Sequence, residues 1–325
     1  MAVIALDLGG TKLAGAILTR RGKMLYQTAV PLARRRGRAV GELIVTEINN
    51  LLAFARSKRL KVSAVGVAVP GIVNPRSGRV WAPNIQGWRS YPLQRQIEAT
   101  TSSPAIRVVI DSDRACSILG EAWQGAARGC RHAIFLSVGT GIGAGILVDG
   151  KVLRGANDIA GAIGWLALDR PFRREYVACG CFEHHASGVG LAKVACELLA
   201  QSQTKTPALQ HSNSPALLHS ISPTANEIFA AYERHDPVAR NVLAQALEFW
   251  GMAVANLVSL FNPEKIIFGG GVFGPARRFL NDIYAEARKW AQPITINRVK
   301  LEGSKLRGDA ALYGAARLAL QAQSA

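Results

Sequence analysis

The 325-residue chain has only five cysteines and few aromatic residues, 7% of the total. An odd, scattered set of cysteines does not form the disulfide framework of a small secreted protein, so a reducing cytoplasm is expected. Acidic residues are also scarce, 22 against 39 basic ones, for a formal charge of +17. The N-terminal apolar run stops at Asp7 without a basic segment before it, which predicts neither a signal peptide nor a membrane span.

The basic residues are dispersed and are not interleaved with aromatic side chains. They are dense only at 33–38 (ARRRGR) and 56–61 (RSKRLK). Proteins that bind single-stranded nucleic acid combine basic grooves with aromatic rings on which bases stack. The charge therefore favours small anionic partners such as nucleotides or polyphosphate, and a solvated basic face over a nucleic-acid site.

Two glycine-containing segments share one design. Residues 3–18 (VIALDLGGTKLAGAIL) predict a buried strand, a glycine turn and a second strand, with TRRGKM as the following turn. Residues 132–153 repeat the strand, glycine loop and strand. With 49% hydrophobic residues, the chain is long enough for two domains, and the repeated hairpin predicts two related lobes with a nucleotide between them.

Periodicity and turn residues predict the other elements. The chain is expected to form a helix at 40–59, a strand at 62–71, a strand, turn and helix at 107–125, a mobile surface loop at 200–222, a helix at 236–261, a strand at 262–273 and a helix at 308–323. Asp236 is predicted to cap its helix, with Pro237 at the first helical position.

The segment VACGCFEHHASG, residues 177–188, contains two cysteines and two histidines. Thiolate and imidazole are the ligands that zinc prefers. The spacing from Cys179 to Cys181 differs, however, from that of zinc fingers and ribbons. The segment alone leaves open a metal site, a substrate site or the remnant of one.

The glycine loops are candidate nucleotide-binding sites, because glycine lets backbone amides approach a phosphate and threonine adds a hydroxyl donor. Asp7, at a strand end, is placed to orient Mg²⁺ or its water, and Lys12 either neutralises phosphate or is simply solvated. The predicted nucleotide-binding residues are Asp7, Gly9, Gly10, Thr11, Lys12, Gly139, Thr140, Gly141, Gly269, Gly270 and Gly271.

Several motifs in this order resemble the ROK family of sugar kinases and repressors: DLGGTK (7–12), PG (70–71), PN (83–84), an Asp before a helix ending in LGE, SVGTGIGAG (137–145), GC-x-E-x-x-x-SG and FGGGV (268–272). The resemblance implies an α/β, actin-like ATPase (ribonuclease H-like) fold of two lobes with the nucleotide in the cleft between them. It implies an N-terminal lobe at 1–120, completed by the helix in 308–325, a C-terminal lobe at 121–307, and a homodimer.

The same resemblance implies ATP-dependent phosphorylation of a hexose or sugar-like hydroxyl compound with ATP and Mg²⁺. Asp113 matches the general base, although Asp111 or Asp113 could instead cap the helix. The expected substrate-binding residues are Gly71, Asn84, Asp113 and Glu183.

Two sugar ligands of the family are replaced here, a Glu by Ala162 and a His by Trp165. Arg174 and Tyr176 stand where two zinc cysteines belong, so no zinc is expected. These departures favour a second hypothesis, a weak or inactive regulatory protein that binds sugar or nucleotide. The +17 charge raises polyphosphate as an alternative phosphoryl donor.

Overall fold

The computed structural model describes residues 1–100, 106–205 and 222–323. By packing, the chain divides into two compact units. The first comprises Met1–Arg131, Gly145–Ala160 and Ser304–Ala325, and the second comprises His132–Ala144 and Gly161–Gly303.

The first unit is built on a sheet of the order β3-β2-β1-β4-β7. Its strands are β1 (Ala2–Leu8), β2 (Lys12–Thr19), β3 (Met24–Pro31), β4 (Val62–Val69) and β7 (Arg107–Ser112). The predicted hairpin is confirmed, since β1 and β2 pair antiparallel, while β4 runs parallel to both β1 and β7. Strand β3 was not expected. Its side chains are mostly exposed, so it lacks the apolar alternation that marks a strand.

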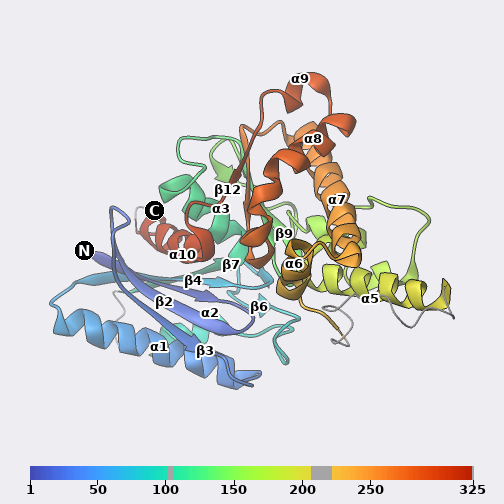
Figure 1. Cartoon of the computed structure of the whole chain (residues 1–325). Helices are drawn as coiled ribbons and strands as arrows, with labels where there is room; N and C mark the ends of the chain where they lie inside the picture. Colours follow the sequence, from blue (N-terminus) through green and yellow to red (C-terminus); the bar gives the residue numbers. More distant parts are fainter. Residues whose placement is uncertain (101–105, 206–221, 324–325) are drawn as a thin grey trace. The chain divides into compact units, whose positions relative to one another are not determined.

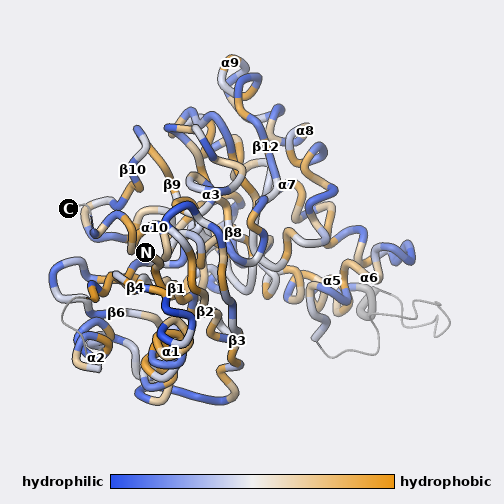
Figure 2. Tube along the Cα trace, turned by 90° about the vertical axis from the view of Figure 1, so that its left-hand side faces the viewer, coloured by the Kyte–Doolittle hydropathy of each residue, from blue (hydrophilic) through white to orange (hydrophobic). Residues whose placement is uncertain are grey.

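Helices cover both faces of this sheet (Figure 1). Ile4 and Leu6 pack in one apolar cluster with residues of α1 (Arg38–Ser57) and α2 (Leu93–Thr100). Val3 and Ala5 pack on the other face with α10 (Ala310–Gln321) and α3 (Asp113–Gln124). Successive strand residues point to opposite faces, so β1 must be apolar on both sides. The outer helix α1 is amphipathic, and Figure 2 shows hydrophilic and hydrophobic stretches alternating along it.

Glycines bring α3 and α10 close together. A Cβ on Gly314 would lie 1.6 Å from the Cys116 carbonyl oxygen, and one on Gly120 would lie 2.1 Å from that of Ala310. At the end of α3, the buried carboxylate of Glu121 accepts hydrogen bonds from the Ala126 and Leu306 backbones and from the Ser304 hydroxyl. The LGE sequence thus joins α3 to the C-terminal segment.

A second five-stranded sheet has the order β10-β9-β8-β11-β12. Its strands are β8 (Ala133–Val138), β9 (Ile142–Val148), β10 (Lys151–Val152), β11 (Lys265–Gly269) and β12 (Lys300–Gly303). Strand β11 runs parallel to β8 and β12. The predicted strand, glycine loop and strand at 132–153 are confirmed. A short third sheet pairs β5 (Ile72–Val73) with β6 (Val80–Trp81).

The helices of the second unit are α4 (Cys181–Ala186), α5 (Gly188–Lys205), α6 (Ala225–Glu233), α7 (Pro237–Phe261), α8 (Leu280–Trp290) and α9 (Pro293–Ile296). Helix α7 starts as predicted, because the Asp236 side chain accepts a hydrogen bond from the Ala239 backbone and Pro237 opens the helix. It has the length and apolar composition to cross a membrane. However, 61% of its most apolar 18-residue stretch is buried within the protein, as in the core helix of a globular domain.

The loop predicted at 200–222 is described only in part. Helix α5 extends to Lys205, and residues 206–221 lie outside the described chain. The short 3₁₀ helices are η1 (Ile163–Trp165), η2 (Arg174–Val177), η3 (Gly271–Phe273), η4 (Pro275–Phe279) and η5 (Arg307–Asp309).

Candidate active site

Two carboxylates of the first unit lie near enough to interact electrostatically. Asp7 is the second-last residue of strand β1, and Asp113 begins helix α3. Burial, followed by the Asp113 carboxylate, raises the pKa of Asp7 to about 7; Asp309 adds to the rise and Lys12 opposes it. A divalent cation offsets such repulsion, and carboxylate oxygens are the ligands that Mg²⁺ prefers. The residues present therefore fit Mg²⁺.

The helix that carries Asp113 is capped by neither of the two aspartates considered from the sequence. Ser112 is the N-cap, and its hydroxyl accepts a hydrogen bond from the Ala115 backbone at 3.2 Å. The Asp113 carboxylate accepts one from the adjacent Arg114 backbone at 2.8 Å. Burial raises the pKa of Asp113, while Arg114 lowers it. A half-buried carboxylate with a raised pKa is suited to accept a proton.

Asp111 instead forms an ion pair that the sequence analysis missed. Nη1 of Arg154 donates to Oδ1 of Asp111 and Nη2 donates to Oδ2, each at 2.6 Å. The Asp111 side chain is 5% exposed and that of Arg154 is 43% exposed. These residues are 43 positions apart in the chain, so no local pattern could have indicated the pair. It fixes the end of β7 directly before Ser112 and Asp113.

The first glycine loop forms the turn of the β1–β2 hairpin. The Gly9 backbone N–H donates to the Lys12 carbonyl at 3.0 Å, and no atom of the described chain lies within 4 Å of where a Cβ on Gly10 would stand. Thr11 and Lys12 are exposed. The loop thus presents open backbone and one cationic side chain, which suits an anion.

Gly71 and Asn84 also belong to the first unit. Gly71 has a φ of +113°, and a Cβ there would lie 2.1 Å from the Trp81 carbonyl oxygen, so this turn requires glycine. Asn84 is exposed.

The glycine loops of the second unit come together at the carboxyl ends of two parallel strands. Gly269 at the end of β11 pairs with Ser137 near the end of β8. A Cβ on Gly139 would lie 4.0 Å from the Gly271 nitrogen. The predicted residues Gly139, Thr140 and Gly141 therefore lie beside Gly269, Gly270 and Gly271, although the two groups are more than a hundred positions apart in the sequence.

Glu183, on α4, lies against the β8–β9 loop. Its Oε2 accepts a hydrogen bond from the Ile142 backbone at 2.7 Å. A Cβ on Gly141 would lie 2.6 Å from that oxygen, and one on Gly164 would lie 3.0 Å from it. Burial raises the pKa of Glu183, while the Ile142 hydrogen bond and Lys193 lower it. Small residues on both sides thus leave room for this carboxylate.

The two residues that depart from the expected sugar ligands lie close to Glu183 in the chain's fold. Trp165 follows Gly164 directly and is 58% exposed, and Ala162 precedes the same short helix η1. The Trp165 indole is therefore an exposed aromatic surface in this segment.

The ROK family model matches residues 3–322. The chain belongs to the ROK family. This ROK protein is 31% identical over 329 residues to a glucokinase from Halalkalibacterium halodurans, with 99% of this chain and 96% of the relative covered. It is 28% identical over 318 residues to a putative xylose repressor from Caldicellulosiruptor, with 96% of this chain and 76% of the relative covered.

Among solved structures, this ROK protein is similar to a ROK glucokinase from Streptomyces griseus in complex with glucose and AMPPNP. The TM-score is 0.76 and the identity 30%, with 99% of this chain and 100% of that one covered. The predicted α/β, actin-like ATPase fold is thereby confirmed. Both sugar kinases and repressors occur among the relatives.

The segment 177–188 of this ROK protein does not fit zinc. In the part of the chain that the structure describes, no three His, Cys, Asp or Glu residues are grouped so that they could hold a metal ion. Tyr176 occupies the position expected for a zinc cysteine, and its hydroxyl lies 2.8 Å from Nε2 of His185. A hydrogen bond between two side chains is found at the position where the family motif has a zinc cysteine.

Proposed function

We propose that this protein is an ATP-dependent kinase of a hexose or sugar-like polyol, with Asp113 as the general base. The observation that carries the proposal is the half-buried Asp113 carboxylate at the start of α3, close enough to Asp7 to raise the pKa of Asp7. The intact glycine loops and the glucokinase relatives support it.

MgATP, when bound, supplies the phosphoryl group. Asp113 accepts the proton of the acceptor hydroxyl as its oxygen bonds to the γ-phosphorus, and the bond from that phosphorus to the β–γ bridging oxygen breaks to release ADP. Asp7 orients Mg²⁺ directly or through water. The proposed nucleotide contacts are Gly9, Gly10, Thr11, Lys12, Gly139, Thr140, Gly141, Gly269, Gly270 and Gly271. Glu183 is proposed to accept a hydrogen bond from an acceptor hydroxyl, and Gly71 and Asn84 to contact the acceptor as well. Homodimerisation and a cytoplasmic location belong to the same proposal.

The test measures ADP release from the purified protein with MgATP across hexoses, N-acetylhexosamines, acidic sugars and polyols. Turnover that disappears in Asp113→Asn, which keeps the shape of the side chain, is the expected result. Adding polyphosphate in place of ATP tests the alternative donor that the +17 charge suggests. Turnover that survives in Asp113→Asn would exclude this residue as the base.

A second candidate function is that of a regulatory protein that binds sugar or nucleotide with little or no phosphoryl transfer. Ala162 and Trp165 favour it, because a site without the usual carboxylate and imidazole makes fewer hydrogen bonds to the sugar. The repressor relatives are consistent with it. Tight sugar binding by calorimetry, without ADP release for any acceptor, would favour this function over the kinase.

A further inference from the structure

Helix α4, which carries Glu183, is too short to hold its own position. It spans six residues, Cys181–Ala186, and its N-cap, Gly180, has no side chain to bond the free backbone N–H groups. Isolated helices of this length are unstable in water, so contacts with neighbouring elements must decide where the helix lies. Helix α7 supplies part of these contacts, since the Trp250 indole N–H donates to the Ala186 carbonyl at 3.1 Å, and the segment before α4 supplies another part.

Tyr176 is the centre of that segment. Its side chain is buried, and its ring contacts the rings of His184 and His185 edge to face, with centroids 5.3 and 5.6 Å apart. His185 in turn stacks on Phe249 of α7, with centroids 4.2 Å apart and ring planes 9° from parallel. The Tyr176 carbonyl accepts a hydrogen bond from the Gly180 N–H at 2.8 Å, next to the start of α4.

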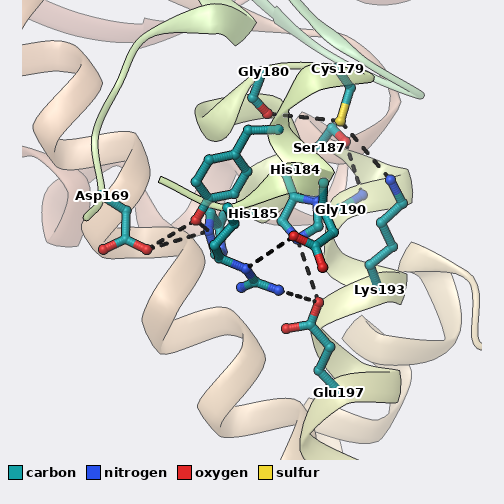
Figure 3. A network of polar contacts seen from close by, with 12 residues as sticks. Asp169, Cys179, Gly180, His184, His185, Ser187, Gly190, Lys193 and Glu197 are labelled. Carbon is teal, nitrogen blue, oxygen red and sulfur yellow. Dashed lines mark hydrogen bonds and ion pairs between the residues drawn. The ribbon is translucent and has the colours of Figure 1, made fainter. Parts of the chain in front are cut away.

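A chain of hydrogen bonds runs through the Tyr176 hydroxyl. This hydroxyl lies 2.8 Å from Nε2 of His185 and donates to Oδ2 of Asp169 at 3.1 Å (Figure 3). Nδ1 of His185 is buried and has no partner among the described residues. A buried N–H without an acceptor is costly, so the proton of the neutral ring belongs on Nε2. The order of donation is therefore His185 to Tyr176 to Asp169.

A second set of contacts joins the same segment and α4 to the neighbouring helix α5. Arg173 donates to Glu197 at 2.9 Å, and Nε2 of His184 lies 3.5 Å from the same carboxylate oxygen (Figure 3). Arg173 and Glu197 are partly exposed, however, and pairs of that kind contribute little. The chain through Tyr176 is the buried hydrogen-bonded attachment of α4 to the segment before it.

We propose that Tyr176 is the positioning residue for Glu183: through His185 and Asp169 it holds α4 where the Glu183 carboxylate can meet an acceptor hydroxyl, without a metal ion. The binding role of Glu183 rests on the proposed function. The holding of α4 does not, so the two can fail separately.

Tyr176→Phe removes the hydroxyl and keeps the buried ring. The matched control is Tyr284→Phe, because the Tyr284 hydroxyl donates to the Ile296 carbonyl at 3.0 Å in α8, away from Glu183 in the sequence. Hydrogen exchange of the amides at 182–186 is expected to be about tenfold faster in Tyr176→Phe, the effect of one lost buried hydrogen bond, and unchanged in Tyr284→Phe. Exchange that stays at the wild-type rate in Tyr176→Phe would overturn the proposal, whether or not the protein is a kinase.

If an acceptor is found, Tyr176→Phe should raise its KM about tenfold and leave the KM for MgATP unchanged, and Tyr284→Phe should change neither. In a Glu183→Ala background the effect of Tyr176→Phe on acceptor KM should vanish, because the residue it positions is gone. Faster exchange with an unchanged acceptor KM would overturn the positioning role. If the wild-type protein turns over no acceptor, the proposed function fails, and exchange alone decides whether Tyr176 holds α4.

Discussion

Arg154 and Asp111 form a bidentate ion pair, with Nη1 and Nη2 of the guanidinium each 2.6 Å from one carboxylate oxygen. Arg154→Ala would leave the buried Asp111 carboxylate without its partner. We expect the free energy of unfolding to fall by about 2 kcal/mol, less than for a fully buried pair because Arg154 is half exposed. Urea denaturation measures the change. Adding Asp111→Asn to Arg154→Ala should recover part of the lost stability, because the uncharged amide needs no cationic partner. An Arg154→Ala variant as stable as the wild type would contradict the prediction.

Magnesium dependence should vary with pH through Asp7. Its pKa is raised to about 7, chiefly by burial, so below neutrality the carboxyl is mostly protonated and must lose its proton to bind a cation. If the protein is an active kinase, the Mg²⁺ concentration for half-maximal rate should fall roughly fivefold from pH 6 to pH 7, and less above it. Asp7→Asn should lose both the tight binding and this dependence. A pH-independent requirement in the wild type would rule out Asp7 as the titrating group.

The contact between α3 and α10 should not accept a side chain at Gly314. Alanine there would place Cβ 1.6 Å from the Cys116 carbonyl oxygen. Separating the two helices should cost about 3 kcal/mol or prevent folding. Gly308→Ala is the control, because no atom of the described chain lies within 4 Å of its Cβ position. Thermal unfolding compares the two variants, and equal melting temperatures would refute the packing.

Acid should destabilise the protein through His185. Burial, followed by the neighbouring His184, lowers the pKa of His185 from 6.5 to about 4. The unfolded chain therefore binds a proton below pH 6.5 that the folded chain does not, and stability falls as the pH drops from about 6.5 to 4, by up to ~3 kcal/mol. The nearby Asp169 and Glu197 oppose the shift, and Arg173 adds to it.

Denaturation between pH 7 and 4 measures this slope. His185→Gln should be less stable at pH 7 and should lose stability less steeply with acid. The buried His184 also has a lowered pKa, so part of the slope should remain. A slope identical to the wild type would assign the acid sensitivity to other groups.

Metal analysis tests the segment 177–188 directly. Because Tyr176 and His185 bond to each other and the described residues contain no group of three or more His, Cys, Asp or Glu that could hold a metal ion, purified protein should contain far less than one zinc per chain. A chelator should leave the melting temperature unchanged. Stoichiometric zinc, or a loss of stability with the chelator, would show that the segment holds a metal after all.

Local sequence patterns were sufficient for most of the elements and for the glycine loops. Asp236 and Pro237 start α7 because capping and the fixed φ of proline act within one helical turn. The apolar runs of β1 and β2 predict buried strands because each residue must face one of two covered sides. Strand β3 was not predicted, because its residues are mostly exposed and its strand conformation depends on pairing with β2.

The order of residues is enough to indicate the family, the glycine loops and the absence of the usual sugar and zinc ligands at 162, 165, 174 and 176. Which side chains contact one another around these positions became visible in the folded chain. Ser112 caps α3 while Asp111 pairs with Arg154, 43 positions away, and the fold brings the Tyr176 hydroxyl within hydrogen-bond distance of His185 and Asp169. Such hydrogen bonds depend on burial and on distances across the fold, which the order of residues along the chain does not specify.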